Sequence, residues 1–192
     1  KDNIVDSSWY LAIEKEMAKL GFEIDNCRRD FIQKLNTVLT EKNNYFPLIK
    51  LHLKKKPIKN KEVFFENLIN QRGQDLVSGR TNCGPHTDDL HGFYFEKDID
   101  TKYCSTGEQK LSIISIILSN AKLIKEQHNI SPILLLDEIT AHLDEVRKEN
   151  LFSELLSSES QFFISGTDIG IFNSLSKKAK FLELGERKKF VA

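Results

Sequence analysis

The sequence predicts an α/β fold in which a largely parallel sheet is joined to part of a helical arm. Three runs of strand type alternate with helical patterns toward the C-terminus: SPILLLDE from Ser131, QFFISG from Gln161 and AKFLEL from Ala179. Such alternation favours parallel pairing, because each return to the sheet then passes through a crossover helix. The N-terminal part shows a long, highly charged helical pattern instead. We therefore expect two parts, residues 1–78 and residues 79–192.

The first part opens with a helical pattern from Ser8 to about Lys42. Apolar residues recur along it at helical spacing and predict an elongated arm or hairpin, interrupted at Gly21. This stripe consists of Trp9, Ile13, Met17, Leu20, Ile24, Phe31, Leu35 and Val38. A tryptophan on such a stripe is more often a core residue than a ligand contact, so we expect Trp9 to belong to a core.

Three further elements are expected between the arm and the second part. The alternating run LIKLHL, residues 48–53, predicts a strand and is followed by the basic loop KKKPIKNK. KEVFFENLINQRGQDLVSG then predicts a helix that ends at Gly73 or Gly79. After the turn GPHTDD, the run HGFYFE predicts another strand.

The stretch CSTGEQKLSIISIILSNAK predicts a helix that starts with a small polar turn. Ser105 and Glu108 have the spacing of a capping box, and an apolar stripe of Ile113, Ile117, Ala121 and Ile124 follows. A cap alone would explain the turn. The free N–H groups and the dipole at a helix start also bind anions, so a phosphate site is the second interpretation.

The segment ILLLDEITAHLD places two carboxylates at the carboxyl end of an apolar strand, where α/β sheets bind ligands. Asp137 suits a Mg²⁺ ligand acting through water beside a triphosphate, and Glu138 suits a base that orients and deprotonates water. The alternative is an ordinary strand that ends in a helix cap. Burying two carboxylates without a cation or polar partners would be unfavourable.

Composition narrows the class of protein only a little. Lys+Arg and Asp+Glu are both 28, so the net charge gives no global indication of a nucleic-acid partner. The three cysteines have no C-x-x-C spacing, which disfavours a zinc site or disulfide framework and fits a reducing cytoplasm. No apolar run approaches the length of a membrane span, so we expect no membrane partner.

Three motifs occur in the order, and on the elements, typical of ABC-type ATPases: STGEQK, ILLLDE and TAHLD. With GRTNCGPHTDDL, residues 79–90, and with QFFISGTD and KAKFLELGE, they resemble the C-terminal half of the RecF family. These are bacterial gap-repair ATPases related to SMC-type proteins. The resemblance covers most of the chain and implies the C-terminal portion of an ABC-type ATPase core.

The resemblance also implies roles for individual residues. The full protein would bind ATP and Mg²⁺ between the two subunits of an ATP-dependent homodimer. Asp137 would support Mg²⁺, Glu138 would activate water, and Asp144 would help to form the dimer interface. The signature turn that contacts the partner's ATP would consist of Ser105, Thr106, Gly107, Glu108 and Gln109.

For the cell, the resemblance implies a cytoplasmic bacterial protein of DNA replication, DNA repair and the SOS response to DNA damage. ATP-driven dimerisation would occur on gapped DNA or at junctions of single and double strands. RecO and RecR would be partners that help RecA to replace single-strand-binding protein.

The sequence departs from the family in one large respect, because it contains no P-loop of the form G-x-x-x-x-G-K-[ST]. In GRTNCGPH, Gly79 and Gly84 have the right spacing, but Pro85 stands where a lysine is required. With Lys1 as first residue, we expect a fragment that begins within the arm and is inactive alone, the full protein being the ATPase. Smaller departures are Thr87, where the family usually has Arg, and Glu138, where it often has Asp.

Several interpretations stay open. The lysines of the basic loop form either a solvated loop or a contact with the DNA backbone; Lys54, Lys55 and Lys56 are the candidates for DNA binding. His86, Asp88 and Asp89 are either functional or part of a turn that stabilises the return from arm to core. The alternatives for function are another SMC-like ATPase, or an ATP-gated DNA-binding clamp without significant turnover.

Overall fold

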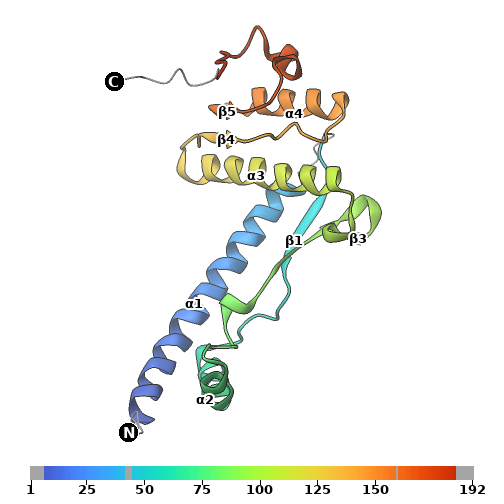
Figure 1. Cartoon of the computed structure of the whole chain (residues 1–192). Coiled ribbons are helices and arrows are strands. Elements are labelled where there is room, and N and C mark those ends of the chain that lie inside the picture. Colours follow the sequence, from blue (N-terminus) through green and yellow to red (C-terminus); the bar gives the residue numbers. More distant parts are fainter. Residues whose placement is uncertain (1–6, 42–44, 159, 185–192) are drawn as a thin grey trace, which may run out of the picture.

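The computed structural model describes residues 7–41, 45–158 and 160–184. An arm made of the helices α1 (Ser7–Leu39) and α2 (Lys61–Ser78) extends from a body that contains the remaining helices and strands (Figure 1). α1 runs from the tip of the arm to the underside of the body, where it packs against the helix α3 (Thr106–His128). This single helix therefore joins the two ends of the molecule.

The buried face of α1 is not the apolar stripe that the sequence predicts. α1 continues through Gly21 without a break, and its buried residues near the tip are Glu14, Ala18, Gly21 and Asp25. Trp9 is 55% exposed, so the expectation that it belongs to a core is wrong. Ile13, Leu20, Ile24 and Phe31 are exposed with it; Leu35 and Val38, near the body, are buried. The small and charged residues face α2, and no described element covers the apolar ones.

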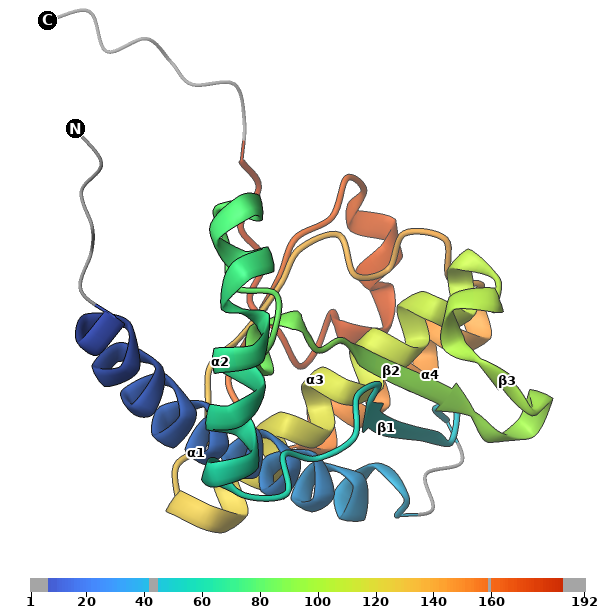
Figure 2. The same cartoon turned by 90° about the horizontal axis from the view of Figure 1, so that it is seen from below.

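α2 crosses α1 at close range because Gly21 has no side chain (Figure 2). A Cβ at Gly21 would lie 2.4 Å from Cε1 of Phe64, a buried residue of α2. α2 is capped by the Asn60 side chain, which accepts a hydrogen bond from Val63 N. It ends at Gly79, whose φ of 66° lies in the left-handed region that favours glycine. Of the two predicted endpoints, Gly79 is therefore the right one.

The two predicted strands near the arm pair with each other, which the sequence did not indicate. β1 (Ile49–Leu53), β2 (Leu90–Tyr94) and β3 (Ile99–Asp100) form an antiparallel sheet in that order. Asn36 of α1 holds the free edge of β1, since its side-chain amide donates to Leu51 O at 2.8 Å and its oxygen accepts from Leu51 N at 2.8 Å. Strands from both predicted parts thus share one sheet.

The predicted parallel pairing is confirmed for β4 (Leu134–Leu136) and β5 (Phe162–Ile164). α3 and the helix α4 (Glu145–Ser157) pack with Leu134 and Leu136 into the largest apolar core. The opposite face of the pair carries Leu135, which is 77% exposed, and Phe163, which is 56% exposed. Strands of this composition are usually covered on both faces. Here only one face is covered by the described elements.

Two local expectations are wrong. In α3, Ile113 and Ile117 are exposed, while the buried face runs through Leu111, Ile114 and Ala121. The run AKFLEL, residues 179–184, forms no strand, because no neighbouring strand within the described residues offers it hydrogen bonds. A 3₁₀ helix, Ile169–Leu175, follows β5 instead. The last two residues of the predicted motif KAKFLELGE lie outside the described residues.

Short 3₁₀ turns at Pro85–Thr87, Phe95–Lys97 and Thr101–Tyr103 connect the remaining elements. None of the helices in the described part of the chain combines the length and apolarity needed to cross a bilayer.

Candidate functional site

The start of α3 forms the predicted capping box. Ser105 Oγ accepts a hydrogen bond from Glu108 N at 3.4 Å, and Glu108 Oε2 accepts from Ser105 N at 3.0 Å and from Ser105 Oγ at 2.9 Å. Lys97, from the turn after β2, adds an ion pair to Glu108 Oε1 at 2.6 Å. These contacts lower the pKa of Glu108 to about 2, and the contact with Lys97 makes the largest contribution to that shift. The turn is therefore held rigidly by groups of its own chain.

The other residues of this turn face the loop that follows β4. A Cβ at Gly107 would lie 3.5 Å from Arg147 Nη1 and 3.6 Å from His142 O. Thr106 is exposed in the first turn of α3. Gln109 Nε2 donates to Lys102 O at 3.0 Å. The start of α3, the loop after β4 and the start of α4 thus meet at one place.

Asp137 and Glu138 directly follow β4 and are both exposed. The Ser165 hydroxyl, at the same level after β5, donates to Asp137 Oδ1 and accepts from Glu138 N at 3.0 Å. Sequence reasoning missed Ser165. Its signal was available, since parallel strands bring the residues after their carboxyl ends together.

The backbone of Glu138 adopts an unusual conformation. Its φ is 44°, and the φ of His142 is 64°, although neither residue is glycine. A non-glycine residue in this region costs about 1–3 kcal/mol and persists only where its surroundings hold it. Lys110, in the second turn of α3, supplies such a hold, because its Nζ donates to Glu138 O at 2.7 Å and to Ala141 O at 2.9 Å. Sequence reasoning missed Lys110 as well.

Asp144 caps α4, where its Oδ1 accepts a hydrogen bond from Arg147 N at 2.8 Å. Arg147 Nε lies 3.4 Å from Asp144 Oδ2. The Asp144 side chain is 58% exposed, so the cap leaves much of this side chain open to solvent. The predicted candidates from the signature turn, the strand end and the interface loop therefore lie at one edge of the body.

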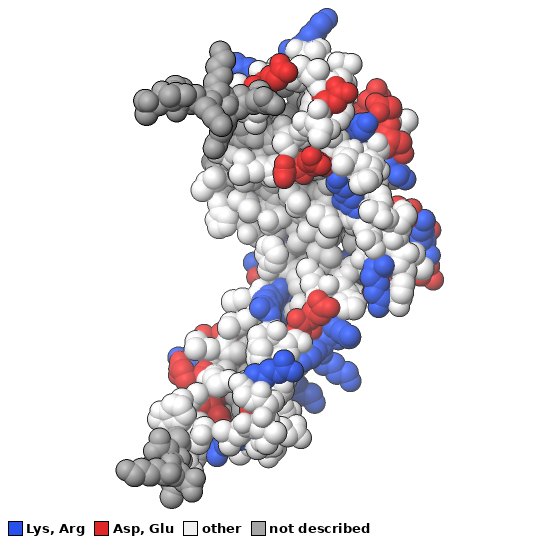
Figure 3. Space-filling view, viewed as in Figure 1, with Lys and Arg blue, Asp and Glu red and all other residues white. Residues whose placement is uncertain are grey.

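Lys54, Lys55 and Lys56 lie elsewhere, at the junction of arm and body. Figure 3 shows lysine and arginine side chains gathered at this narrow region. All three are exposed, but they differ in contacts. Lys55 Nζ donates to Thr87 Oγ1, and Lys55 N donates to Asp88 Oδ1 at 2.8 Å. Among the described residues, no ion pair involves Lys54 or Lys56.

A cluster that we call the clasp, consisting of Asp25, Arg29 and Asp88, joins α1 to this junction. Arg29 Nε donates to Asp25 Oδ2 at 2.9 Å, and Arg29 Nη2 lies 3.7 Å from Asp88 Oδ2. Asp25 also accepts from Ile58 N at 3.0 Å. Beside the clasp, Arg28 Nη1 donates to Pro85 O at 2.5 Å. These contacts agree with the interpretation of GPHTDD as a turn that fixes the return from the arm.

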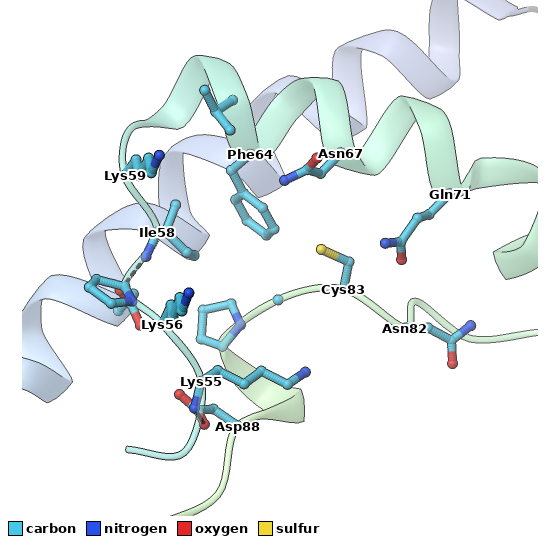
Figure 4. Close-up of a pocket in the computed structure, with 15 residues that line it drawn as sticks. Lys55, Lys56, Ile58, Lys59, Phe64, Asn67, Gln71, Asn82, Cys83 and Asp88 are labelled. Atoms are coloured by element: carbon cyan, nitrogen blue, oxygen red, sulfur yellow. Dashed lines mark hydrogen bonds between the residues drawn. The ribbon is translucent and has the colours of Figure 1, made fainter. Parts of the chain in front are cut away.

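A cavity of about 370 Å³ opens next to the clasp (Figure 4). Phe64, Asn67 and Gln71 of α2 line it on one side, and Lys55 and Cys83 on the other. Burial raises the pKa of the Cys83 thiol, and the charge of Lys55 opposes that rise only in part. The thiol is therefore expected to stay protonated near neutral pH.

A scan against protein-family models finds none that matches the chain. Individual proteins do match. The chain is 36% identical over 191 residues to the DNA replication and repair protein RecF of Allorhizobium ampelinum, covering 94% of the chain and 51% of that protein. It is 35% identical over 187 residues to RecF of Rhizobium meliloti, covering 92% and 50%. The chain spans about half the length of these curated relatives.

Two solved structures share the fold. One, of the recombination mediator protein RecF-ATP in the RecFOR pathway, has a TM-score of 0.69 at 20% identity and covers 88% of the chain and 47% of that structure. The other, of RecF-ATPrS, has a TM-score of 0.66 at 21% identity, with 88% and 48% covered. The predicted α/β class is thereby confirmed, and the parallel sheet that the structure shows is the small one of β4 and β5. The chain belongs to the RecF family and matches a C-terminal half of its members.

Proposed function

We propose that this chain is the signature-bearing half of a RecF-type ATPase that dimerises on DNA in replication and recombinational repair. One observation carries the proposal: the turn at residues 105–109 and the carboxylates of Asp137 and Glu138 lie at one edge of the body, joined through Lys110. A helix start offers N–H groups to an anion, and carboxylates after a parallel strand can bind a cation. Together they suit a nucleoside triphosphate and its metal ion. The relatives' name and the ATP of the solved structures support the same interpretation.

The residues at this edge suit Mg²⁺. Asp137 is an exposed carboxylate with the hydroxyl of Ser165 beside it, and Mg²⁺ prefers such hard oxygen ligands, often through water. When bound, Mg²⁺ would neutralise charge on the phosphates. Asp137 would orient the water ligands, and Glu138 would accept a proton from the attacking water.

The arrangement between subunits follows the same logic. Ser105, Thr106, Gly107, Glu108 and Gln109 would contact ATP held by the partner subunit. The exposed side of Asp144 would lie in the dimer interface. We keep the division into an arm portion, 1–78, and an ATPase portion, 79–192, as part of this proposal.

The proposed partners are gapped or junction DNA, with Lys54, Lys55 and Lys56 among the backbone contacts, and RecO, RecR and RecA. The proposed location is the bacterial cytoplasm. Measured turnover in the full-length protein would separate this ATPase from an ATP-gated clamp that hydrolyses nothing.

The substitution Gly107→Asp tests the ATP sandwich in full-length protein. In the subunit itself the new side chain has room and lies near the guanidinium of Arg147, so thermal melting should be little changed. Against a partner's γ-phosphate, the carboxylate would be repelled by about 4 kcal/mol at 4 Å and an effective dielectric of 20. We expect ATP binding to persist while ATP-dependent dimerisation, measured by sedimentation, fails. Normal dimerisation by a well-folded variant would contradict the proposal.

A further inference from the structure

Both backbone polar groups of Glu138 are held by side chains from other elements. Its N–H donates to Ser165 Oγ at 3.0 Å, and its carbonyl accepts from Lys110 Nζ at 2.7 Å and, within the loop, from Ala141 N at 3.2 Å. Lys110 also reaches Ala141 O at 2.9 Å, which closes the loop from the other end. Two elements that are distant in sequence, α3 and the end of β5, therefore donate and accept hydrogen bonds at the same residue.

These hydrogen bonds are needed to hold the backbone, because Glu138 has a φ of 44°. Glutamate avoids the left-handed region, where its Cβ crowds the backbone, and would leave it if the neighbours allowed. Rotation back to a right-handed or extended conformation would turn the Cα–Cβ bond and redirect the carboxylate. A charged donor makes a stronger hydrogen bond than a neutral one, so the bond from Lys110 is the strongest of the three that hold the Glu138 backbone.

Lys110 is itself fixed to the signature turn. It follows Gly107 by three residues on α3, hence about one helical turn along. The contacts of Glu108 with Lys97 and of Gln109 with Lys102 fix the same stretch to the β2–β3 connection. A ligand that shifts the start of α3 relative to β4 would therefore move the Lys110 amine relative to the Glu138 carbonyl.

We propose that Lys110 is a positioning residue for Glu138: it holds the Glu138 backbone in its left-handed conformation and links the aim of this carboxylate to occupancy of the signature turn. The inference rests on the proposed ATPase function and deepens it. A nucleotide bound by the partner subunit at the turn would thus set the geometry of the base in this subunit's own site. Lys110 acts through the backbone and does not itself contact the reacting atoms.

The first test does not depend on catalysis. Lys110→Met in full-length protein removes the amine and keeps much of the side-chain length. Lys122→Met is the matched control, because Lys122 lies on the same helix but pairs with Glu41 and Glu126. Hydrogen exchange of the peptide spanning residues 137–143 should speed up about tenfold in Lys110→Met and stay unchanged in Lys122→Met. Equal exchange in both variants would overturn the proposal.

The second test is a double-mutant cycle with Glu138→Gln. Alone, Lys110→Met should lower kcat about tenfold or more, with the KM for ATP within twofold, and Lys110→Arg should recover part of the loss. In the Glu138→Gln background, Lys110→Met should have no further effect, because there is no base left to aim. An equal additional loss, or a selective loss of ATP affinity, would overturn it. Absence of turnover in the wild type would refute the ATPase, whereas the exchange result would still decide the hold on Glu138.

Discussion

The clasp and the edge of the body that carries Asp137 and Glu138 both gather charged groups, but the charges are held in opposite ways. At the clasp, Asp25 is 3% exposed and its carboxylate is satisfied by Arg29 and a backbone N–H. At the edge, Asp137 and Glu138 are exposed, and what the chain fixes is the backbone of Glu138. One region satisfies its charges internally. The other holds its carboxylates toward solvent in a strained loop, which is where a ligand would meet them.

The difference is useful because it separates structural charges from functional ones within one chain. Charges of the first kind should control the free energy of unfolding and leave turnover alone. Charges of the second kind should do the reverse.

The largest effect is expected for Glu138→Gln in full-length protein. If Glu138 is the general base, turnover should fall by about 10²–10⁴, and ATP binding should be retained. The dimer formed with ATP should persist in sedimentation, because hydrolysis no longer ends it. Glu149→Gln, an exposed carboxylate on α4, is the control. Unchanged turnover would mean that another group activates water.

Breaking the clasp should affect stability instead. Asp25→Ala removes the nearer of the two carboxylates that pair with Arg29 and leaves Ile58 N–H without its acceptor, and an unsatisfied buried polar group costs about 1–3 kcal/mol. We expect that decrease in the free energy of unfolding by urea denaturation, with turnover per folded molecule unchanged. Asp30→Ala, which removes an exposed partner of Lys34, should cost less than about 1 kcal/mol. Equal costs would remove the distinction between the two regions.

Substitutions at two glycines test how α1 and α2 pack in the arm. Gly21→Ala places a Cβ against Phe64, and overpacking of this kind costs about 1–3 kcal/mol. Gly73→Ala, inside α2 with nothing within 4 Å of its Cβ, should stabilise by about 0.5–1 kcal/mol, because alanine is the better helix former. Thermal melting of the two variants should therefore shift in opposite directions. Phe64→Leu should relieve the first variant and not the second.

The lysines of the junction should not behave alike. Replacing Lys54 and Lys56 by alanine should reduce the salt dependence of DNA binding by a slope of about 0.9 for each duplex phosphate that the protein no longer neutralises. Lys55→Ala should in addition weaken the junction, because Lys55 is hydrogen-bonded to Thr87. Binding titrations at several salt concentrations measure the slopes. An unchanged slope in the double variant would assign this run to a solvated loop.

The smallest effect is expected on the stability of the protein at low pH. Because the folded pKa of Glu108 is about 2 against an ordinary value of 4.5, its contribution to stability is present above the ordinary value. It is lost as the pH falls from about 4.5 through 2. Glu108→Gln should therefore flatten the decline of stability in this window and leave the slope above pH 5 unchanged. Parallel profiles for wild type and variant would show that Lys97 and Ser105 do not stabilise the charged form.

Local signals in the sequence were sufficient for most elements. The helix of α1, the alternation of β1, the stop at Gly79 and the capping box at Ser105 all depend on residues close together in the chain, and all are confirmed. The parallel β4–β5 pair was predicted from its apolar runs. The roles assigned to the site residues stay predictions, since they require nucleotide and a second subunit.

The predictions that failed concern which surfaces of the chain pack against each other. The stripe through Trp9 and Ile13 is helical, yet the face packed on α2 is small and charged because Gly21 permits close approach and Glu14 pairs with Arg72 at 2.5 Å. Lys110 was missed because its contact with the Glu138 backbone spans 28 positions; Ser165, 27 positions away, could be found only from the pairing of β4 with β5. Periodicity contains no information on such distant pairs.

Asn36 has a consequence for association between chains. β1 is the edge of its sheet, and an open edge can recruit a strand from another molecule. The side-chain amide of Asn36 occupies both Leu51 N and Leu51 O, as a neighbouring strand would, from a helix that cannot itself extend the sheet. Asn36→Ala should therefore open a template for intermolecular strand pairing, detectable as concentration-dependent growth of β-rich aggregates by light scattering. A single polar residue on α1 thus protects the β1 edge from strand pairing between chains.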